Sequence, residues 1–332
     1  MINRREFIQK SGMAAGAVAA SALLPTTLLA GDAKKPFFEI SLAQFSLASD
    51  FWNGKLTTLD FPAKAKKDFG ISTVEYVAMF FNGKETDTAW LNDLKTRTGD
   101  LGVKNNLIMV DGDNIADLDD AKRNKAVESH YKWVDAAKHL GCYAIRVNLG
   151  ALDQKGTADE VAKAAIDGYG KVLEYGTKVG IDIIVENHIS YSCNGAWLAN
   201  IMKQVNNPRA GVLPDFGNFC IKRTQPVTND IAGWMGTKCL EEYDKYKGVE
   251  ELMPYAKGVS AKTHKFDAKG NETEIDFKRM LTIIKKSGFK GIIGIEYEGG
   301  LMQSYGQAGY LTNDEGIRAT HKLLLKAADA VS

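Results

Sequence analysis

The sequence predicts an α/β protein built as a single (β/α)8 TIM barrel preceded by an export signal. Eight short apolar runs alternate with eight amphipathic stretches over residues 36–330, and a hydrophobic content of 45% suffices for a large core. The first run lacks a following Gly-rich phosphate-binding motif, which disfavours the alternative of a doubly wound open sheet. Glycines also stand where helical stretches would end in a left-handed residue: Gly70, Gly102, Gly141, Gly180 and Gly288.

Each apolar run is rich in β-branched residues and short enough for a buried strand. The expected strands are residues 38–46, 73–80, 104–110, 144–149, 181–188, 211–216, 258–264 and 291–297. The stretches between them begin near Asp, Thr or Pro and carry apolar residues at helical spacing. The expected helices are residues 58–69, 88–101, 121–140, 157–179, 195–205, 240–255, 275–287 and 313–330. No linker-like or repetitive segment interrupts residues 36–330, so one domain is expected there.

Residues 1–30 have the pattern of an export signal. Arg4 and Arg5 precede a weakly apolar stretch, rich in Ala and Gly, that extends to Ala30. The paired arginines resemble the twin-arginine signal; an ordinary secretory signal and an uncleaved membrane anchor are the alternatives. We therefore expect an exported, periplasmic domain that has no membrane attachment after the signal is removed.

The charge and cysteine content narrow the class of protein. With 42 basic and 41 acidic side chains, the chain lacks the basic excess of a dedicated nucleic-acid binder. Its four cysteines are far apart and form no metal-type pair. An exported location permits a disulfide, for which Cys220 and Cys239 are the nearest pair in sequence, but buried free thiols are the favoured interpretation.

Three of the expected strands carry a carboxylate at their ends: Glu186, Asp215 and Glu296. In a (β/α)8 barrel the carboxyl ends of the strands converge on one face, so these acids should lie together. Buried carboxylates repel one another unless a cation neutralises them, which predicts a divalent metal site. His264, from the remaining strand of this half, would supply a nitrogen ligand, and His188 competes for that role. Such a set suits one Mn²⁺, Co²⁺ or Mg²⁺ ion, and Zn²⁺ also fits.

Other polar residues at the same strand ends are candidates for binding a substrate. Side chains alternate along a strand, so Arg146 and Asn148 share one face. Arg146 and Lys262 could donate to substrate oxygens or form structural ion pairs, and Glu75 could bind a sugar hydroxyl or pair with Arg146. His188, just beyond its strand, would reach a substrate. Aromatic residues fall near this end too, and loop packing is their favoured role: Trp52, Phe80, Phe81, Trp197 and Trp234.

These residues carry a resemblance to the xylose-isomerase-like TIM-barrel superfamily, which includes sugar phosphate isomerases and epimerases. The resemblance covers residues 36–330 and rests on six motifs: Val74-Glu75-Tyr76-Val77, Arg146-Val147-Asn148, Glu186-Asn187-His188, Asp215-Phe216-Gly217-Asn218, Lys262-Thr263-His264 and Glu296-Tyr297-Glu298-Gly299. It implies that a Glu-Asp-His-Glu set holds one divalent metal ion. It also implies that Glu186 and Glu296 flank the substrate as catalytic acid and base.

The sequence departs from the family pattern at two positions. Ser260 stands two residues before Lys262, where the strand-7 histidine of the family is expected. Either His264 takes over that role, or water completes the coordination by three carboxylates. Asn218 ends the Asp215 motif where many members carry a histidine, so Asn218 is the candidate for that substrate contact.

The implied chemistry is proton removal from a carbon next to a carbonyl, giving an enediolate whose reprotonation isomerises or epimerises a sugar. If a leaving group lies β to the carbonyl, the same step makes the enzyme a lyase, such as one acting on a 3-keto-glycoside. Because an exported enzyme seldom meets phosphorylated metabolites, a free sugar or a glycoside is the expected substrate. A non-catalytic sugar-binding protein and an endonuclease-type hydrolase are the remaining alternatives, and homo-oligomerisation is left open.

Overall fold

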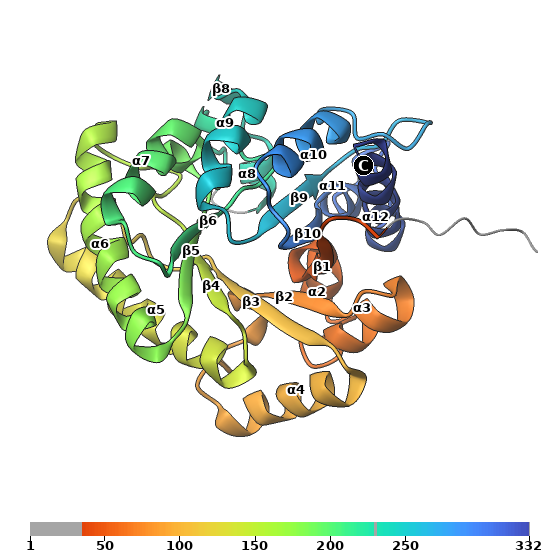
Figure 1. The fold of residues 1–332 in the computed structure, drawn as a ribbon, viewed down its shortest axis with the longest axis horizontal. Coiled ribbons are helices and arrows are strands. Elements are labelled where there is room, and N and C mark those ends of the chain that lie inside the picture. Colours follow the sequence, from red (N-terminus) through yellow and green to blue (C-terminus); the bar gives the residue numbers. More distant parts are fainter. Residues whose placement is uncertain (1–34, 229–230, 332) are drawn as a thin grey trace, which may run out of the picture. The chain divides into compact units, whose positions relative to one another are not determined.

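Eight parallel strands form the centre of the molecule (Figure 1). The computed structural model describes residues 35–228 and 231–331, and the residues from Pro36 onward form one compact unit. The expected signal, residues 1–30, lies outside the described residues. The strands are β1 (Glu39–Ala43), β2 (Thr73–Val77), β3 (Lys104–Val110), β4 (Ala144–Val147), β5 (Asp182–Glu186), β6 (Ala210–Leu213), β9 (Val259–Thr263) and β10 (Ile292–Tyr297). Their order in the sheet is β6-β5-β4-β3-β2-β1-β10-β9.

The two edges of this sheet approach each other and nearly close the barrel. β9 runs parallel to the segment that follows β6, with bridges between Asp215 and Ser260 and between Val212 and Ala256. The Ser260 N–H donates to the Pro214 carbonyl at 2.9 Å. The predicted α/β barrel is therefore confirmed, and its last seam places Asp215 directly beside β9.

The longer helices surround the strands as an outer layer (Figure 1). They are α3 (Phe61–Phe69), α4 (Thr88–Leu101), α5 (Asp120–Leu140), α6 (Ala158–Val179), α7 (Gly195–Val205), α9 (Lys245–Leu252), α10 (Phe277–Lys286) and α12 (Asn313–Ala330). Gly102 and Gly141 end α4 and α5 with φ of 60° and 77°, as predicted. The main core lies between helices and sheet, and a second cluster fills the barrel, including Leu107, Ile184 and Leu213. None of the described helices is long and apolar enough to cross a membrane.

Several strands end earlier than the sequence predicts, because the chain turns sharply at the carboxyl end of the barrel. β1 passes into a 3-10 turn, η1 (Gln44–Leu47), and β2 into another, η2 (Ala78–Phe81). The Gln44 side chain accepts a hydrogen bond from the Val77 N–H at 2.8 Å, which satisfies the backbone where β2 stops. These turns carry apolar side chains onto the rim of the barrel.

The prediction of one helix over residues 240–255 is wrong in its first part. Residues Cys239–Glu242 instead form β8, which pairs antiparallel with β7 (Cys220–Arg223). Helix α9 begins only after Asp244, whose side chain accepts from the Lys247 N–H at 2.8 Å. A short helix, α8 (Ile231–Met235), lies within the connection between β7 and β8.

A disulfide joins Cys220 and Cys239 across this hairpin, with their Cα atoms 5.7 Å apart. The favoured interpretation, free thiols, is therefore wrong for this pair. The alternative, a disulfide between the two cysteines nearest in sequence, is present because the pairing of β7 with β8 brings them together. Cys142 and Cys193 are buried free thiols. The disulfide closes the loop that contains Pro226.

The disulfide predicts a specific thiol count. Protein purified without reductant and then denatured should react at two thiols, those of Cys142 and Cys193, and at four after reduction, as measured by mass spectrometry of alkylated protein. The double variant Cys220→Ser and Cys239→Ser should give two thiols under both conditions. Four reactive thiols in the unreduced wild type would contradict the pairing.

Candidate functional site

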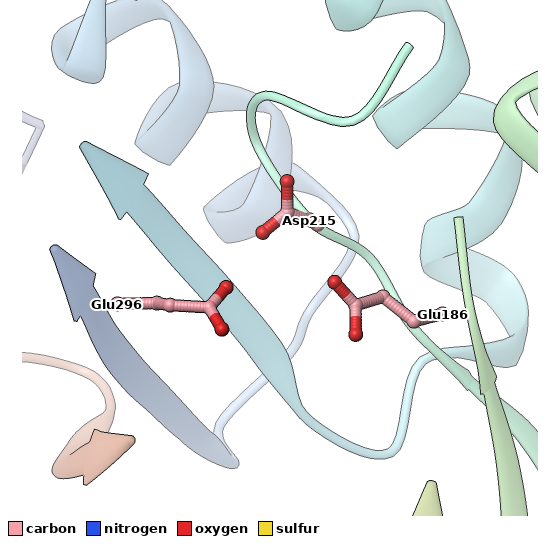
Figure 2. A group of neighbouring side chains, drawn as sticks. All are labelled: Glu186, Asp215 and Glu296. Carbon is pink, nitrogen blue, oxygen red and sulfur yellow. The ribbon is translucent and has the colours of Figure 1, made fainter. Parts of the chain in front are cut away.

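Three carboxylates converge at the carboxyl end of the barrel. Glu186 is the last residue of β5, Asp215 follows β6, and Glu296 lies in β10. One oxygen of each lies within 4.8 Å of the others, and Figure 2 shows the three groups pointing toward a common centre. None of the three residues is more than 4% exposed. The structure thus brings together the three acids that the sequence selects.

Asp215 is held rigidly by hydrogen bonds from its own segment and from Asn187. The Asn187 side chain accepts from the Asp215 N–H at 2.7 Å and donates to the Asp215 carbonyl at 3.1 Å. The N–H groups of Gly217 and Asn218 both donate to Asp215 Oδ1 at 2.8 Å. With Oδ1 occupied in this way, Oδ2 is turned toward β9.

Ser260 on β9 faces that oxygen. Its Oγ lies 2.6 Å from Asp215 Oδ2 and 3.0 Å from Glu296 Oε2. A hydroxyl has one proton to donate, so it can satisfy only one of these two oxygens at a time. Ser260 therefore orients the acids without balancing their charge, and it supplies no nitrogen ligand.

Two buried cations lie beside the carboxylates. Lys262 Nζ is 2.6 Å from Glu298 Oε1 and 3.3 Å from Glu296 Oε2. Arg146 Nε is 2.8 Å from Glu186 Oε2, although neither of these two atoms has an aligned hydrogen-bond partner in the described part of the chain. Four buried carboxylates, counting Glu298, thus face two permanent cations. Asp111, just past β3, also pairs with Arg146, and His264 pairs with Glu298; fully ionised, with these two included and His264 protonated, the group carries a formal charge of −2.

Burial and mutual repulsion disfavour ionisation of the three converging acids. Burial is the largest cause that raises the pKa of Glu186, Asp215 and Glu296, and neighbouring carboxylates raise it further, although Lys262 and other groups oppose them. Burial also acts on Glu298, but Lys262 and His264 outweigh it and lower its pKa. The uncompensated charge therefore lies on the three converging acids.

These residues fit a divalent metal ion. Three buried carboxylate groups offer the oxygen ligands that hard divalent cations prefer, and an ion of charge +2 would balance the group. Glu186 Oε2, a buried acceptor without a hydrogen bond among the described residues, is one ligand atom available for it. Glu186, Asp215 and Glu296 are the residues that would hold the ion.

His264 lies outside this group of three. Its Nε2 is 3.2 Å from Glu298 Oε2, and this contact raises the pKa of the imidazole against the effect of burial. In the structure His264 therefore neutralises Glu298, and its role as a fourth metal ligand stays a prediction. His188 is also separate from the three acids.

A cavity of about 390 Å³ reaches one of the three acids, Glu296. Arg146, His188, Glu296 and Glu298 form part of its lining. Burial lowers the pKa of His188 to about 4, so its ring is neutral at neutral pH, and its buried Nδ1 has no hydrogen-bond partner among the described residues. His188 can therefore form a hydrogen bond with a substrate hydroxyl.

The other predicted substrate residues take different positions. Asn148 bridges Arg146 and Asp111, and Asn218 donates to Glu186 Oε1 at 3.0 Å. Lys262 lies among the acids. Glu75 is 1% exposed, is absent from the cavity lining, and accepts from Ser41 and Asn106. Burial raises the pKa of Glu75.

Sequence reasoning missed Asp111 and underrated Glu298. Asp111 follows β3 directly, forms an ion pair with Arg146 and lines the cavity. It has the same signal as the predicted ligands, an acid at a strand end. Glu298 follows β10 directly and lines the cavity together with Glu296.

Comparison with known proteins identifies the family. The chain belongs to the xylose isomerase-like TIM barrel family, whose model matches residues 63–326. This confirms the resemblance seen in the sequence motifs. A search of curated proteins found no match.

Solved structures show the same fold at low sequence identity. A xylose isomerase domain protein from Planctomyces limnophilus is 14% identical, with a TM-score of 0.61 over 90% of this chain and 99% of that one. An L-ribulose 3-epimerase is 14% identical, with a TM-score of 0.64 over 89% and 95%. An IOLI protein with a binding zinc atom is 14% identical, with a TM-score of 0.62 over 89% and 99%.

The charge balance of the site predicts the effect of removing its lysine. Lys262→Met would leave Glu298 and Glu296 without their buried cation, so the free energy of unfolding should fall by about 3–5 kcal/mol. Urea denaturation of protein treated with EDTA measures this. The control Lys178→Met, at an exposed ion pair with Glu174, should change it by less than about 1 kcal/mol. Equal small effects of both substitutions would contradict the account.

Proposed function

We propose that this protein is a divalent-metal-dependent sugar isomerase or epimerase that removes a proton next to a carbonyl and forms an enediolate. The observation that carries the proposal is the group of three buried carboxylates, one of which, Glu296, lines a substrate-sized cavity. Membership of the xylose isomerase-like family supports it. A non-catalytic sugar-binding protein would not need converging buried acids.

Glu186, Asp215 and Glu296 would hold one Mn²⁺, Co²⁺ or Mg²⁺ ion, with Zn²⁺ as a further option. The IOLI protein, one of the structural neighbours, contains a bound zinc atom. A bound divalent cation would supply Lewis-acid polarisation of the substrate carbonyl. The chain itself must then move the proton and position the sugar.

Glu296 is the residue best placed to accept the substrate proton. Its carboxyl lines the cavity, and burial raises its pKa toward that of an effective general base. Glu186, the last residue of β5, would return the proton on another carbon or face. Arg146 and His188 would hold substrate oxygens from the cavity wall. Return to another carbon gives isomerisation, and return to the opposite face gives epimerisation.

A lyase is the second candidate, and the charge of the cavity favours a glycoside substrate for it. Asp111, Glu296 and Glu298 line the cavity against one arginine, so the site suits a neutral sugar better than a sugar phosphate. With a 3-keto-glycoside, Glu296 would take the proton α to the carbonyl and the electron pair would expel the β-oxygen substituent. That C–O bond breaks, and the departing oxygen takes up a proton. Export to the periplasm, as the N-terminal sequence indicates, would bring the enzyme to such substrates.

Hydrogen exchange tests the proposal directly. NMR in D₂O, with a panel of ketoses and 3-keto-glycosides and metal-loaded protein, should reveal solvent deuterium at a carbon next to the carbonyl. Glu296→Gln should reduce this exchange by at least about 100-fold, because the amide cannot accept the proton. The control Glu174→Gln, at an exposed position on α6, should leave it unchanged. Undiminished exchange by the Glu296→Gln variant would overturn the mechanism.

A further inference from the structure

The lining of the cavity contains two chemically different sets of side chains. Its polar groups, including His188 and Glu296, come from the strand ends that carry the acids. Its apolar side chains include Phe45, Trp52 and Met79, which come from the turns and short helix after β1 and β2. In the order of strands, β1 and β2 lie across the barrel from β5 and β6. His188, after β5, therefore lies across the barrel from the turn after β1, whereas Glu296 lies on β10, the neighbour of β1. A ligand in the cavity would touch both polar groups and an apolar surface.

Three large apolar residues of the cavity lining are exposed to solvent, two from the segments after β1 and β2 and one, Leu152, from the segment after β4. Trp52, Met79 and Leu152 are 40%, 46% and 51% exposed, and all three line this one cavity. Large apolar side chains that gather around a cavity mark a binding surface more often than isolated ones do. Trp52 is also held in place, because its ring packs edge-on against Phe45 and tilts against Phe80, both at 6.0 Å. This part of the lining is thus a preformed surface.

The charge of the lining argues against a phosphorylated ligand in this cavity. Among the described residues that line the cavity, Arg146 is the one permanently charged cation, and it is already engaged by Asp111 and Glu186. A phosphate carries about two negative charges at neutral pH and would meet the acids of the lining. A neutral, apolar group suits the exposed apolar side chains of the lining instead.

We propose that the apolar side chains of the cavity lining, Phe45, Trp52, Met79 and Leu152, form a subsite for the apolar aglycone of a glycoside. The proposal rests on the proposed function to the extent that the sugar ring then lies over the carboxylates. Transfer of an aromatic or aliphatic aglycone from water onto such a surface is favourable. The substrate class is accordingly a glycoside with an apolar aglycone, in preference to a free sugar or a sugar phosphate.

Matched pairs of unreactive glycosides isolate this subsite. Isothermal titration of the full metal-loaded chain would compare phenyl with methyl β-D-glucopyranoside, and phenyl with methyl β-D-galactopyranoside. In at least one pair the phenyl glycoside should bind about tenfold more tightly. Trp52→Ala and Leu152→Ala should bring this ratio close to one and leave the affinity for the methyl glycoside nearly unchanged. The control Leu325→Ala, on α12 and 38% exposed, should preserve the ratio.

Three results would overturn the subsite: equal affinities within both pairs, no binding of any of the four glycosides, or equal weakening of both members of a pair by Trp52→Ala. The last would show that Trp52 stacks on the sugar ring itself. Deuterium exchange with a free ketose, together with a ratio of one, would leave the proposed function standing without the subsite. A preserved preference for the phenyl glycoside, without deuterium exchange on any sugar, would support the subsite and contradict the proposed function.

Discussion

Buried negative charge at the carboxyl ends of β5, β6 and β10 is the constraint on which the rest of the site depends. Desolvated carboxylates within 4.8 Å of one another are tolerated only where cations and hydrogen-bond donors surround them. Lys262 and Arg146 supply part of the positive charge, and Ser260 contributes a hydroxyl hydrogen bond. The formal charge that remains equals that of one divalent cation, which links the geometry of the barrel to its proposed chemistry.

The barrel fold explains how one chain can hold such a group and still offer room for a substrate. The seam between β6 and β9 positions Asp215 beside Ser260, and β10 places Glu296 on the other side of that serine. β1 and β2 carry none of the three acids, and the turns after them bring apolar side chains to the rim of the barrel.

Local sequence patterns predict much of this arrangement. Apolar runs locate the strands, and the position of an acid at the end of a run selects Glu186, Asp215 and Glu296 without knowledge of the structure. The same logic would have found Asp111 if the residue just past β3 had been considered. Alternation along β9 also placed Lys262 on the inner face.

Features that depend on long-range pairing were not predictable in this way. The β7–β8 hairpin needs two segments to meet, which no local periodicity reports. Sequence spacing named Cys220 and Cys239 as the candidate pair, but it favoured free thiols because it could not show that this hairpin forms. Side chains inside a barrel are stacked in layers, and the layer that Glu75 occupies depends on how the neighbouring strands are placed. Its burial against Ser41 could therefore not be predicted from its own strand.

Metal binding to the purified protein tests the central claim most directly. EDTA-treated wild type titrated with Mn²⁺ in a calorimeter should bind one ion per chain. Asp215→Asn should abolish this binding, because it removes one of three charges at the centre of the group, whereas Asp329→Asn on the surface should not. Absence of binding by the wild type at millimolar Mn²⁺, or unchanged binding by Asp215→Asn, would contradict the account.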